Sequence, residues 1–539
     1  MTRPGRRCLN PESMRKLLIL AAALLSAACA EAPQPEINVI PRPLSVEQGD
    51  GAFRLGRSCP IGYDDPALQS VAALCAGYLT EEGERKPVVA DKPVHKGIDL
   101  QLDDTLAGEE YTLSATKKGV SICGGSPRAV LYGVQTLRQL IDGDRVPVVE
   151  IRDEPYFGYR GAMFDVARYF YPVEEVKRFI DIMALHKLNT FHWHLTDDQG
   201  WRIEIKRYPE LTRIGSQRRE TLIGHYKTSD EYDGKPHGGY YTQDEIREVV
   251  AYAAERCIDI IPEIELPGHS MAALASYPWL GCTKGPYEVR TTWYYSCDVL
   301  CAGRETTFEF LENVLTEVLG LFPSKYIHVG GDECPKVRWK ACPDCQRRMR
   351  REGLADEDAL QSYFVCRIEE WLHAHGREMI GWDELLEGGV TPSTIVMSWR
   401  GTEGGIEAAK LGNRVIMAPR FYFYLDYYQT SDPERNGEPL SIGRNVPIRK
   451  LYGYDPFDRL DEAQSRNILG VQANLWTEYI STMDHAEYML LPRLAAMSEV
   501  AWATERRDYD DFVRRLGSLR GLYDREGYRY ADFVFRGIE

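Results

Sequence analysis

The feature that most constrains the fold is an alternation of short apolar runs with longer amphipathic segments, which begins at Tyr159. Eight runs are predicted to be strands: Gly161–Val166, Thr190–Leu195, Ile258–Ile264, Tyr326–Val329, Glu378–Trp382, Ile395–Trp399, Val415–Ala418 and Gly470–Asn474. Helical segments follow several of them: 172–186, 242–256, 306–321 and 358–375. Such repeated units predict an α/β protein with a (β/α)8 TIM barrel, closed by helices between 485 and 523. A doubly wound open sheet is the alternative, but no glycine-rich phosphate loop supports it.

The region before the barrel has a different pattern. Residues 31–152 are predicted to form a small α+β domain, in which short apolar runs alternate with one clear helix, Ser126–Ile141. This helix would begin with Pro127 just inside a serine cap. The catalytic barrel would then occupy residues 153–539.

The N-terminus, residues 1–30, is typical of a targeting segment. Met14-Arg15-Lys16 supplies positive charge, Leu17–Leu25 an apolar stretch, and Ser26-Ala27-Ala28-Cys29 a small-residue cleavage site. A cysteine in this place resembles a bacterial lipobox, although Ser26 stands where leucine is usual, so an ordinary secretory signal is the alternative. No later stretch is long and apolar enough to span a bilayer. We therefore expect an exported protein, periplasmic or anchored at the outer membrane or surface, that contacts a membrane only through a lipid on Cys29.

The net charge bears on binding to nucleic acid, and the positions of the cysteines bear on disulfides and metal sites. The net charge of −16 argues against a nucleic-acid partner, which requires a basic face. Cys282 and Cys301 lie close enough in sequence for a loop-closing disulfide. Cys342-Pro-Asp-Cys345 has the spacing of half a zinc site, but no second CxxC pair accompanies it. A disulfide or a pair of free thiols is therefore the favoured interpretation of these cysteines.

Carboxylates and aromatic residues follow nearly every expected strand. The run Tyr326–Val329 is stopped by Gly330-Gly331 and delivers two adjacent acids, Asp332 and Glu333. Neighbouring side chains on an extended backbone point to opposite sides, so the two acids can take different roles. The other strand ends carry Asp165, Arg168, Asp197, Asp198, Glu263, Glu265, His269, Trp382, Trp399, Asp426, Trp476 and Glu478. Because barrel enzymes keep their chemistry at this face, flat aromatic rings and convergent acids there suit a pyranose sugar.

Several separate motifs then occur in order: His192-Trp193-His194-Leu195-Thr196-Asp197-Asp198-Gln199, Pro267-Gly268-His269, His328-Val329-Gly330-Gly331-Asp332-Glu333 and Trp476-Thr477-Glu478. With these motifs the sequence resembles the family-20 glycoside hydrolases, which are exo-acting β-N-acetylhexosaminidases. The resemblance covers roughly residues 36–510, including a small domain before the barrel. It implies an enzyme that removes terminal β-linked GlcNAc or GalNAc from glycans or chito-oligosaccharides, without a metal or other cofactor.

The resemblance also implies a mechanism and the roles of the site residues. The substrate's own acetamido oxygen attacks the anomeric carbon to form an oxazoline, and the anomeric configuration is retained. Glu333 would be the general acid, and Asp332, in its ionised form, would orient the acetamide. Arg168 would bind the 3- and 4-hydroxyls. Asp197 and His269 would support Glu333. Trp382, Trp399 and Trp476 would surround the acetamido group and the sugar ring. Tyr424 would bond the acetamido oxygen, and Asp426 and Glu478 would bond the outer hydroxyls.

Other interpretations remain open at this point. The loops at 212–240 and 276–305 are expected to shape the leaving-group side. His192, His194, Asp198 and Gln199 fit a supporting position as well as a contact with substrate. A disaccharide-releasing enzyme, a glycan-binding protein without turnover and a metal-dependent deacetylase are the rival functions. The adjacent acids argue against the binding protein, since a binder has no need of a buried proton donor.

Overall fold

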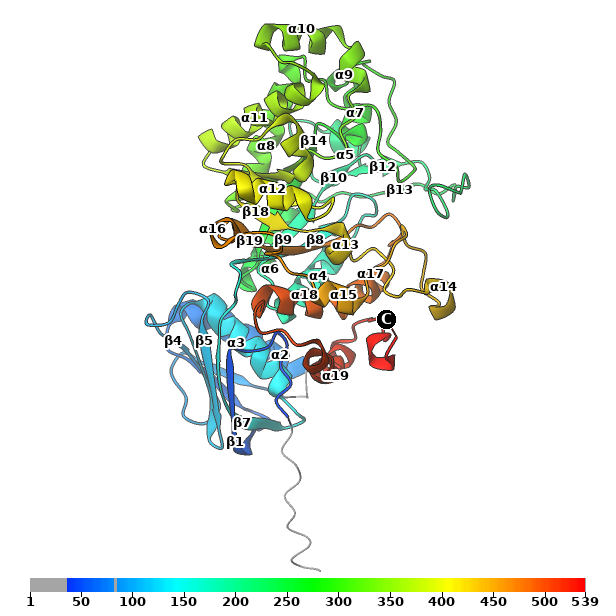
Figure 1. The fold of residues 1–539 in the computed structure, drawn as a ribbon. Coiled ribbons are helices and arrows are strands. Elements are labelled where there is room, and N and C mark those ends of the chain that lie inside the picture. The colour runs from blue at the N-terminus through cyan, green and yellow to red at the C-terminus, as the bar shows by residue number, and fades with distance from the viewer. Residues whose placement is uncertain (1–35, 82–84, 539) are drawn as a thin grey trace, which may run out of the picture.

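The computed structural model describes residues 36–81 and 85–538, which form a small N-terminal domain and a large barrel domain (Figure 1). The expected leader, residues 1–30 with Cys29, lies outside the described residues. Within the described part, none of the helices has the length and apolar character needed to cross a membrane.

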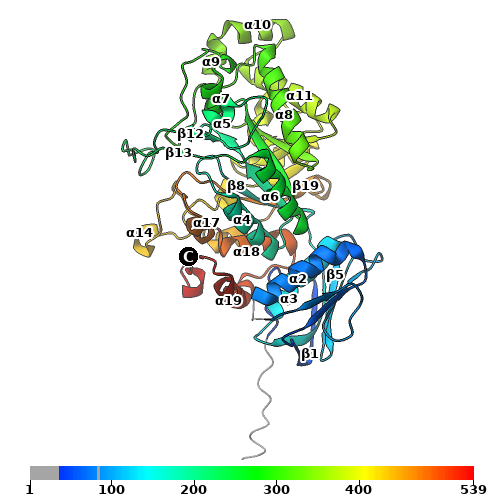
Figure 2. The same ribbon diagram turned by 180° about the vertical axis from the view of Figure 1, so that it is seen from behind.

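The N-terminal domain is one seven-stranded mixed sheet with two helices packed on one face (Figure 2). In spatial order its strands are β1 (Ser45–Arg54), β7 (Arg145–Asp153), β5 (Tyr111–Thr116), β6 (Gly119–Gly124), β4 (Ile98–Leu102), β2 (Pro60–Tyr63) and β3 (Val88–Ala90). The predicted helix is confirmed as α3 (Pro127–Leu140), whose Ser126 side chain accepts the Ala129 N–H. A second helix, α2 (Gln69–Glu81), was missed in the sequence.

The barrel is confirmed. Eight parallel strands close on themselves: β8 (Tyr159–Asp165), β9 (Thr190–His194), β14 (Asp259–Leu266), β15 (Tyr326–Gly330), β16 (Glu378–Trp382), β17 (Ile395–Ser398), β18 (Val415–Met417) and β19 (Ile468–Leu475). Each coincides with an expected strand to within two residues at either end. The open-sheet alternative is thus wrong, because β19 pairs with β8 and leaves the barrel without an edge.

Helices surround the barrel, and short elements fill the loops beyond the strand ends. The longer helices are α4 (Val173–Leu185), α6 (Gln243–Glu255), α8 (Glu305–Leu321), α10 (Pro343–Glu352), α11 (Glu357–Ala374), α12 (Glu403–Leu411), α17 (Met483–Leu490), α18 (Arg493–Trp502) and α19 (Tyr509–Glu526). The short helices are α5 (Glu210–Arg213), α7 (Met271–Ser276), α9 (Val337–Ala341), α13 (Arg420–Phe423), α14 (Pro433–Asn436), α15 (Ile448–Tyr452) and α16 (Glu462–Ser465), and the short strands are β10 (Thr196–Asp197), β11 (Gly200–Trp201), β12 (Gln217–Arg218) and β13 (His237–Gly238).

A buried ion pair fastens the two domains together. Lys187 Nζ lies 3.2 Å from Asp153 Oδ2, and both side chains are fully buried. The indole N–H of Trp502 donates to the other oxygen of Asp153 at 2.8 Å, and Trp502 itself belongs to the core of the N-terminal domain. The small domain is therefore held against the side of the barrel near α18 and α19, away from the strand ends that carry the predicted site (Figure 1).

Candidate active site

A cavity of about 430 Å³ opens at the C-terminal ends of the barrel strands. Its walls include most of the predicted site residues: Arg168, His269, Asp332, Glu333, Trp399, Tyr424, Asp426, Trp476 and Glu478. The other two lie behind the wall. Asp197 contacts Arg168 and His269, and the ring of Trp382 lies 6.1 Å from that of Trp476. The structure thus brings together residues that follow seven different strands.

The end of β15 is built so that only glycine fits. A Cβ atom on Gly330 would lie 1.8 Å from Glu265 Oε2, and one on Gly331 would lie 2.5 Å from the Leu385 side chain. Both glycines have positive φ angles, and Glu333 is also left-handed, with φ of 41°. A non-glycine residue in this region is strained, and such strain is concentrated at functional sites. After this sharp turn the two acids differ in exposure to solvent. The Asp332 side chain is 10% exposed, whereas the Glu333 side chain is 36% exposed.

Asp332 is a buried carboxylate whose charge is only partly compensated. Its Oδ1 has no hydrogen-bond partner in the described part of the chain, and its Oδ2 lies 3.5 Å from Nε2 of His269. Burial raises the pKa of Asp332 from 3.8 to about 6; His269 opposes this rise, and the charge of Glu333 adds to it. Asp332 is therefore mostly ionised at pH 7, as the expected role requires, and takes up a proton as the pH falls below 6.

His269 is a charged ring between three carboxylates. Its Nδ1 lies 3.0 Å from Asp197 Oδ1, and its Nε2 lies 3.4 Å from Glu333 Oε2. Burial opposes its charge, but the carboxylates of Asp197 and Asp332 raise the pKa of His269 well above its ordinary value. The imidazolium therefore faces both acids and holds positive charge beside them at neutral pH.

Asp197 connects the cavity wall to a network of charges in the barrel interior. It accepts from Arg168 Nη2 at 2.8 Å and lies 3.1 Å from Nε2 of His194. Burial alone would raise the pKa of Asp197. The positive charges of Arg168, which has the larger effect, and of His269 hold this pKa well below its usual range. The other ring nitrogen of His194 bonds Glu263, which also contacts His192 at 3.0 Å and His328 at 2.7 Å. These histidines are fully buried inside the barrel and hold Glu263 and Asp197 in place behind the cavity.

Arg168 and two acids form one wall of the cavity. The guanidinium bonds Asp165 at 3.2 Å and lies 4.8 Å from the ring of Trp476. Burial raises the pKa of Glu478 to about 7, with Arg168 opposing the rise. Burial and then the charge of Glu478 raise the pKa of Asp426 well above its ordinary value. Among the described residues, Oδ1 of Asp426 also lacks a hydrogen-bond partner.

Aromatic rings also line the cavity. The rings of Trp399 and Tyr424 are nearly parallel, with their centroids 6.1 Å apart. Tyr424 and Trp476 are also 6.1 Å apart and are inclined to each other. The indole N–H of Trp399 donates to Glu384 at 2.7 Å, which fixes the orientation of that ring. Flat apolar faces beside unpaired acceptors are suited to a ligand with C–H faces and several donors.

Both loops expected on the leaving-group side reach the cavity. The first contributes Tyr226 and Lys227, and the second contributes Trp293, Tyr294 and Tyr295. These five residues were not predicted from the sequence, although the aromatic run at 293–295 was a signal that could have indicated three of them. Five more lining residues were not predicted from the sequence either: Arg420, Tyr427, Ile442, Gly443 and Arg444.

Asp198 and Gln199 explain how the second loop is held in place. Asp198 accepts the Met271 and Ser296 N–H groups, each at 3.0 Å, and Gln199 donates to the Thr292 carbonyl at 2.8 Å. Gln199 also lines the cavity, whereas Asp198 is fully buried among backbone donors. The sequence left open whether Asp198 supports the site or contacts the substrate, and these contacts give it a supporting position.

Comparison with known proteins covers both domains. The family model for the glycosyl hydrolase family 20 catalytic domain matches residues 157–505, and that for glycosyl hydrolase family 20, domain 2, matches residues 36–154. A beta-hexosaminidase of Porphyromonas gingivalis is 44% identical over 534 residues, which cover 95% of this chain and 67% of the relative. A beta-hexosaminidase of Vibrio furnissii is 39% identical, with 86% of this chain and 76% of the relative covered.

Solved structures agree with the sequence relatives. The GH20 exo beta-N-acetylglucosaminidase of Vibrio harveyi, solved in complex with N-acetylglucosamine, is similar with a TM-score of 0.82 and 34% identity. The match covers 92% of this chain and 78% of that one. The GH20 beta-N-acetylhexosaminidase of Streptomyces coelicolor is similar with a TM-score of 0.81 and 32% identity. The match covers 93% of this chain and 98% of that one.

Proposed function

Because the chain belongs to glycosyl hydrolase family 20 and is thus a glycoside hydrolase acting on β-N-acetylhexosamine, we propose that it is an exo-acting, retaining β-N-acetylhexosaminidase that uses substrate-assisted catalysis. Its substrates would be glycans or chito-oligosaccharides that end in β-linked GlcNAc or GalNAc. The enzyme would supply a general acid and an orienting carboxylate, and the sugar would supply the nucleophile.

The single observation that carries this proposal is the buried, partly uncompensated carboxylate of Asp332 at the wall of the cavity. Its Oδ1 has no partner within the described residues, although an unpaired buried acceptor is costly. The N–H of a 2-acetamido group is a donor that a plain hexose lacks. A hydrogen bond from it to Asp332 would turn the acetamido oxygen toward C1 and stabilise the positive charge that develops on nitrogen.

The first step would form one bond and break another at C1. The acetamido oxygen attacks C1 as the glycosidic C–O bond breaks, and Glu333 gives its proton to the departing oxygen. The product of this step is an oxazolinium ion, whose charge lies next to ionised Asp332. In the second step water attacks C1 from the vacated side, the C1–O bond of the oxazolinium ring breaks to restore the acetamido group, and Glu333 takes a proton from the water. Two inversions thus leave the configuration unchanged.

The size and lining of the cavity support action at a chain end. At about 430 Å³, the cavity lies near the lower limit of typical ligand pockets, about 300–1,000 Å³. Arg168, Asp426 and Glu478 line the cavity where the hydroxyls of a terminal sugar would bind, and the aromatic loops would then lie on the leaving-group side.

Hydrolysis of nitrophenyl β-glycosides tests the proposal. We expect cleavage when the sugar is GlcNAc or GalNAc, none when it is glucose, and inhibition by a thiazoline mimic of the oxazoline. Glu333→Gln should lower turnover on unactivated oligosaccharides about 10²–10⁴-fold. Glu387→Gln, on the exposed side of the loop after β16, is the matched control. Full activity of Glu333→Gln, or release of disaccharides only, would contradict the proposal.

We also propose that the protein is exported as a lipoprotein acylated on Cys29. The support is the charged, apolar and small-residue pattern of residues 14–29. Expression of the full chain in a bacterium fed an alkyne-tagged fatty acid should label the wild type but not Cys29→Ser. Secretion of an unlabelled wild-type protein would indicate an ordinary signal peptide instead.

A further inference from the structure

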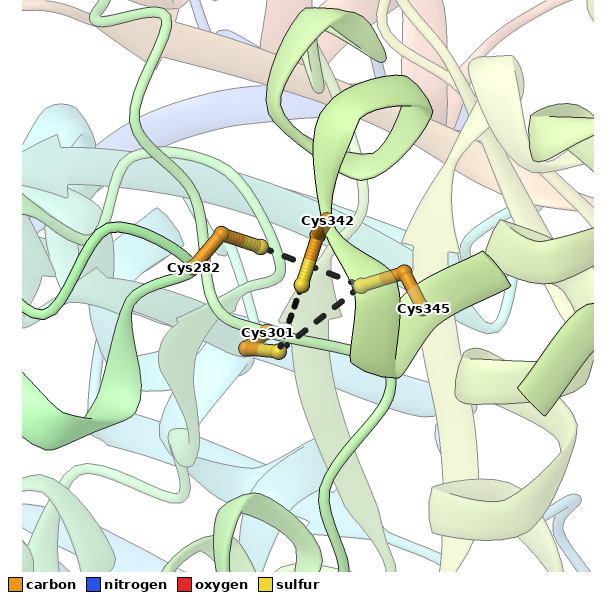
Figure 3. Close-up of side chains that lie close together, drawn as sticks. All are labelled: Cys282, Cys301, Cys342 and Cys345. Carbon is orange, nitrogen blue, oxygen red and sulfur yellow. Dashed lines mark hydrogen bonds between the residues drawn. The ribbon is translucent and has the colours of Figure 1, made fainter. Parts of the chain in front are cut away.

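Four cysteines from three segments of the chain converge beside the active-site loops. Cys282 and Cys301 lie at the two ends of the loop that carries Trp293–Tyr295, and Cys342 and Cys345 lie at the start of α10. Figure 3 shows their side chains directed toward one another from opposite sides. Cys301, Cys342 and Cys345 are buried and Cys282 is partly buried.

Of the two alternatives predicted from the sequence, a disulfide or free thiols, the structure agrees with free thiols. The predicted Cys282–Cys301 disulfide is wrong in this structure, because all four cysteines of the cluster are free thiols. The sequence has no second CxxC pair because the partners of Cys342 and Cys345 are brought together only by folding. Cys282 and Cys301 are the two ends of one loop, joined by the Gly281–Leu300 bridge.

The spacing of the sulfur atoms is that of a tetrahedral metal site. Cys301 Sγ lies 3.8 Å from that of Cys342 and 3.7 Å from that of Cys345, and Cys282 Sγ lies 3.8 Å from Cys345 Sγ. Four sulfurs at about 2.3 Å from a tetrahedral zinc ion are about 3.8 Å from one another. In a disulfide the two sulfurs are about 2.05 Å apart, and Cys301 is placed almost equally between two partners. We propose that Cys282, Cys301, Cys342 and Cys345 bind one structural zinc ion.

The surroundings suit four thiolates. Cys342 is the N-cap residue of α10 and Cys345 lies in its first turn, where the helix dipole favours negative charge. A Cβ on Gly303 would lie 2.3 Å from the Cys345 nitrogen, so the two backbones approach as closely as glycine allows. Zinc binding would displace the four thiol protons to the solvent and leave a site of net charge −2.

Arg304 would partly compensate that charge and lock the ligand-bearing segments together. Its guanidinium donates to the Cys282 carbonyl at 3.3 Å and the Gly281 carbonyl at 3.0 Å. It also bonds the Asp344 carboxylate, in the first turn of α10, at 2.8 Å. Such partners around the ligands are typical of metal sites whose geometry is fixed in advance.

The zinc would fasten the leaving-group loop to the chain that follows the catalytic acids. The loop from Cys282 to Cys301 carries Trp293–Tyr295 into the cavity, while α9 and α10 follow Asp332 and Glu333 in the sequence. Without the ion, the loop would keep its contacts with Asp198 and the Arg304 bond to Asp344, but would lose the direct link between its two cysteines and α10. KM for an oligosaccharide should then rise severalfold, while kcat for a nitrophenyl glycoside should change little. This last effect rests on the proposed function; the metal content does not.

Metal analysis of the full-length protein, purified without chelators, tests the proposal. We expect one zinc per chain by mass spectrometry of the metal, with four sulfur neighbours at about 2.3 Å by X-ray absorption. Titration of the wild type with an organomercurial should release that zinc as four thiols react. Substoichiometric zinc with free thiols, two disulfides in the unreduced protein, or iron in place of zinc would each overturn the proposal.

Matched variants separate the ligands from other cysteines. Cys345→Ser should lose the zinc, and Cys297→Ser, an exposed cysteine of the same loop outside the cluster, should retain it. Should Cys345→Ser fail to fold, Cys282→Ser, at the partly exposed ligand, gives the same comparison. Full zinc content in both ligand variants would contradict the assignment. Zinc present without hexosaminidase activity would leave the metal site standing and refute only the proposed function.

Discussion

Replacing Asp332 with asparagine should make the folded protein more stable at neutral pH while removing most of its activity. Burial raises the pKa of Asp332 from 3.8 to about 6, a shift of about 2 units. Each unit corresponds to about 1.4 kcal/mol, so the ionised carboxylate costs the folded state about 3 kcal/mol relative to the unfolded chain. Asparagine has the same shape but carries no charge that must be buried.

The sign of this effect fixes its pH dependence. Below pH 4 the carboxyl is protonated in both states, and its ionisation costs the fold nothing. Between pH 4 and pH 6 the unfolded chain loses this proton first, which favours unfolding. Above pH 6 the cost is constant. The stability gained by Asp332→Asn should therefore be small at pH 4, grow through pH 6 and level off at about 3 kcal/mol by pH 8.

Urea unfolding at a series of pH values measures this difference directly. Asp230→Asn, at an exposed position, controls for the loss of one charge and should change stability by less than about 0.5 kcal/mol. The attraction of His269 for Asp332 is already included, since it lowers the pKa of Asp332. If Asp332→Asn were less stable than the wild type at every pH, the loss of that attraction would outweigh the relief of burial, and the reasoning would be refuted.

Three further substitutions test separate parts of the structure. Arg168→Lys should lower kcat/KM about 10–100-fold in steady-state assays, because a lysine cannot bond Asp165 and Asp197 together and hydrogen bonds to charged groups contribute about 1.5–3 kcal/mol. Tyr424→Phe keeps the aromatic wall and removes one hydroxyl, so kcat/KM for N-acetyl substrates should fall by about tenfold, as measured with nitrophenyl GlcNAc. Lys187→Ala removes the cationic partner of the buried Asp153 carboxylate, which keeps its hydrogen bond from Trp502, and should lower the free energy of unfolding by about 3 kcal/mol in urea, with unchanged kcat for the folded enzyme.

The barrel could be predicted from the sequence because its strands are buried on both faces. Such strands form continuous apolar runs, and β16 was located to the residue at Glu378–Trp382. The strand ends then followed from the topology, since parallel strands present all their C-terminal ends at one face. Helix α2 was missed because its apolar residues include small ones, Ala72, Ala73 and Ala76, that mark no clear face in the sequence.

The parts that the sequence did not reveal depend on contacts between distant segments. Tyr226 and Arg444 line the same cavity although more than 200 residues separate them, and neither belongs to a recognisable motif. The cysteine cluster is similar: the Cys342–Cys345 pair has a familiar spacing, whereas the spacing of Cys282 and Cys301 is set by the length of a loop. Local pattern therefore located Asp332, Glu333 and the two loops beside the cavity, but not the individual loop residues that line it.

The site combines several features that oppose folding and that a sugar substrate would relieve. Glu333 and His269 both have left-handed backbones, and Oδ1 of Asp332 and of Asp426 lack partners within the described chain. Each unpaired buried acceptor costs the fold about 1–3 kcal/mol, and a donor that reaches it recovers that free energy as binding. An acetamido N–H at one acceptor and hydroxyls at the other would do so, whereas a plain hexose would leave Asp332 unpaired. Selectivity for N-acetyl sugars would thus follow from a carboxylate that the protein itself leaves without a donor.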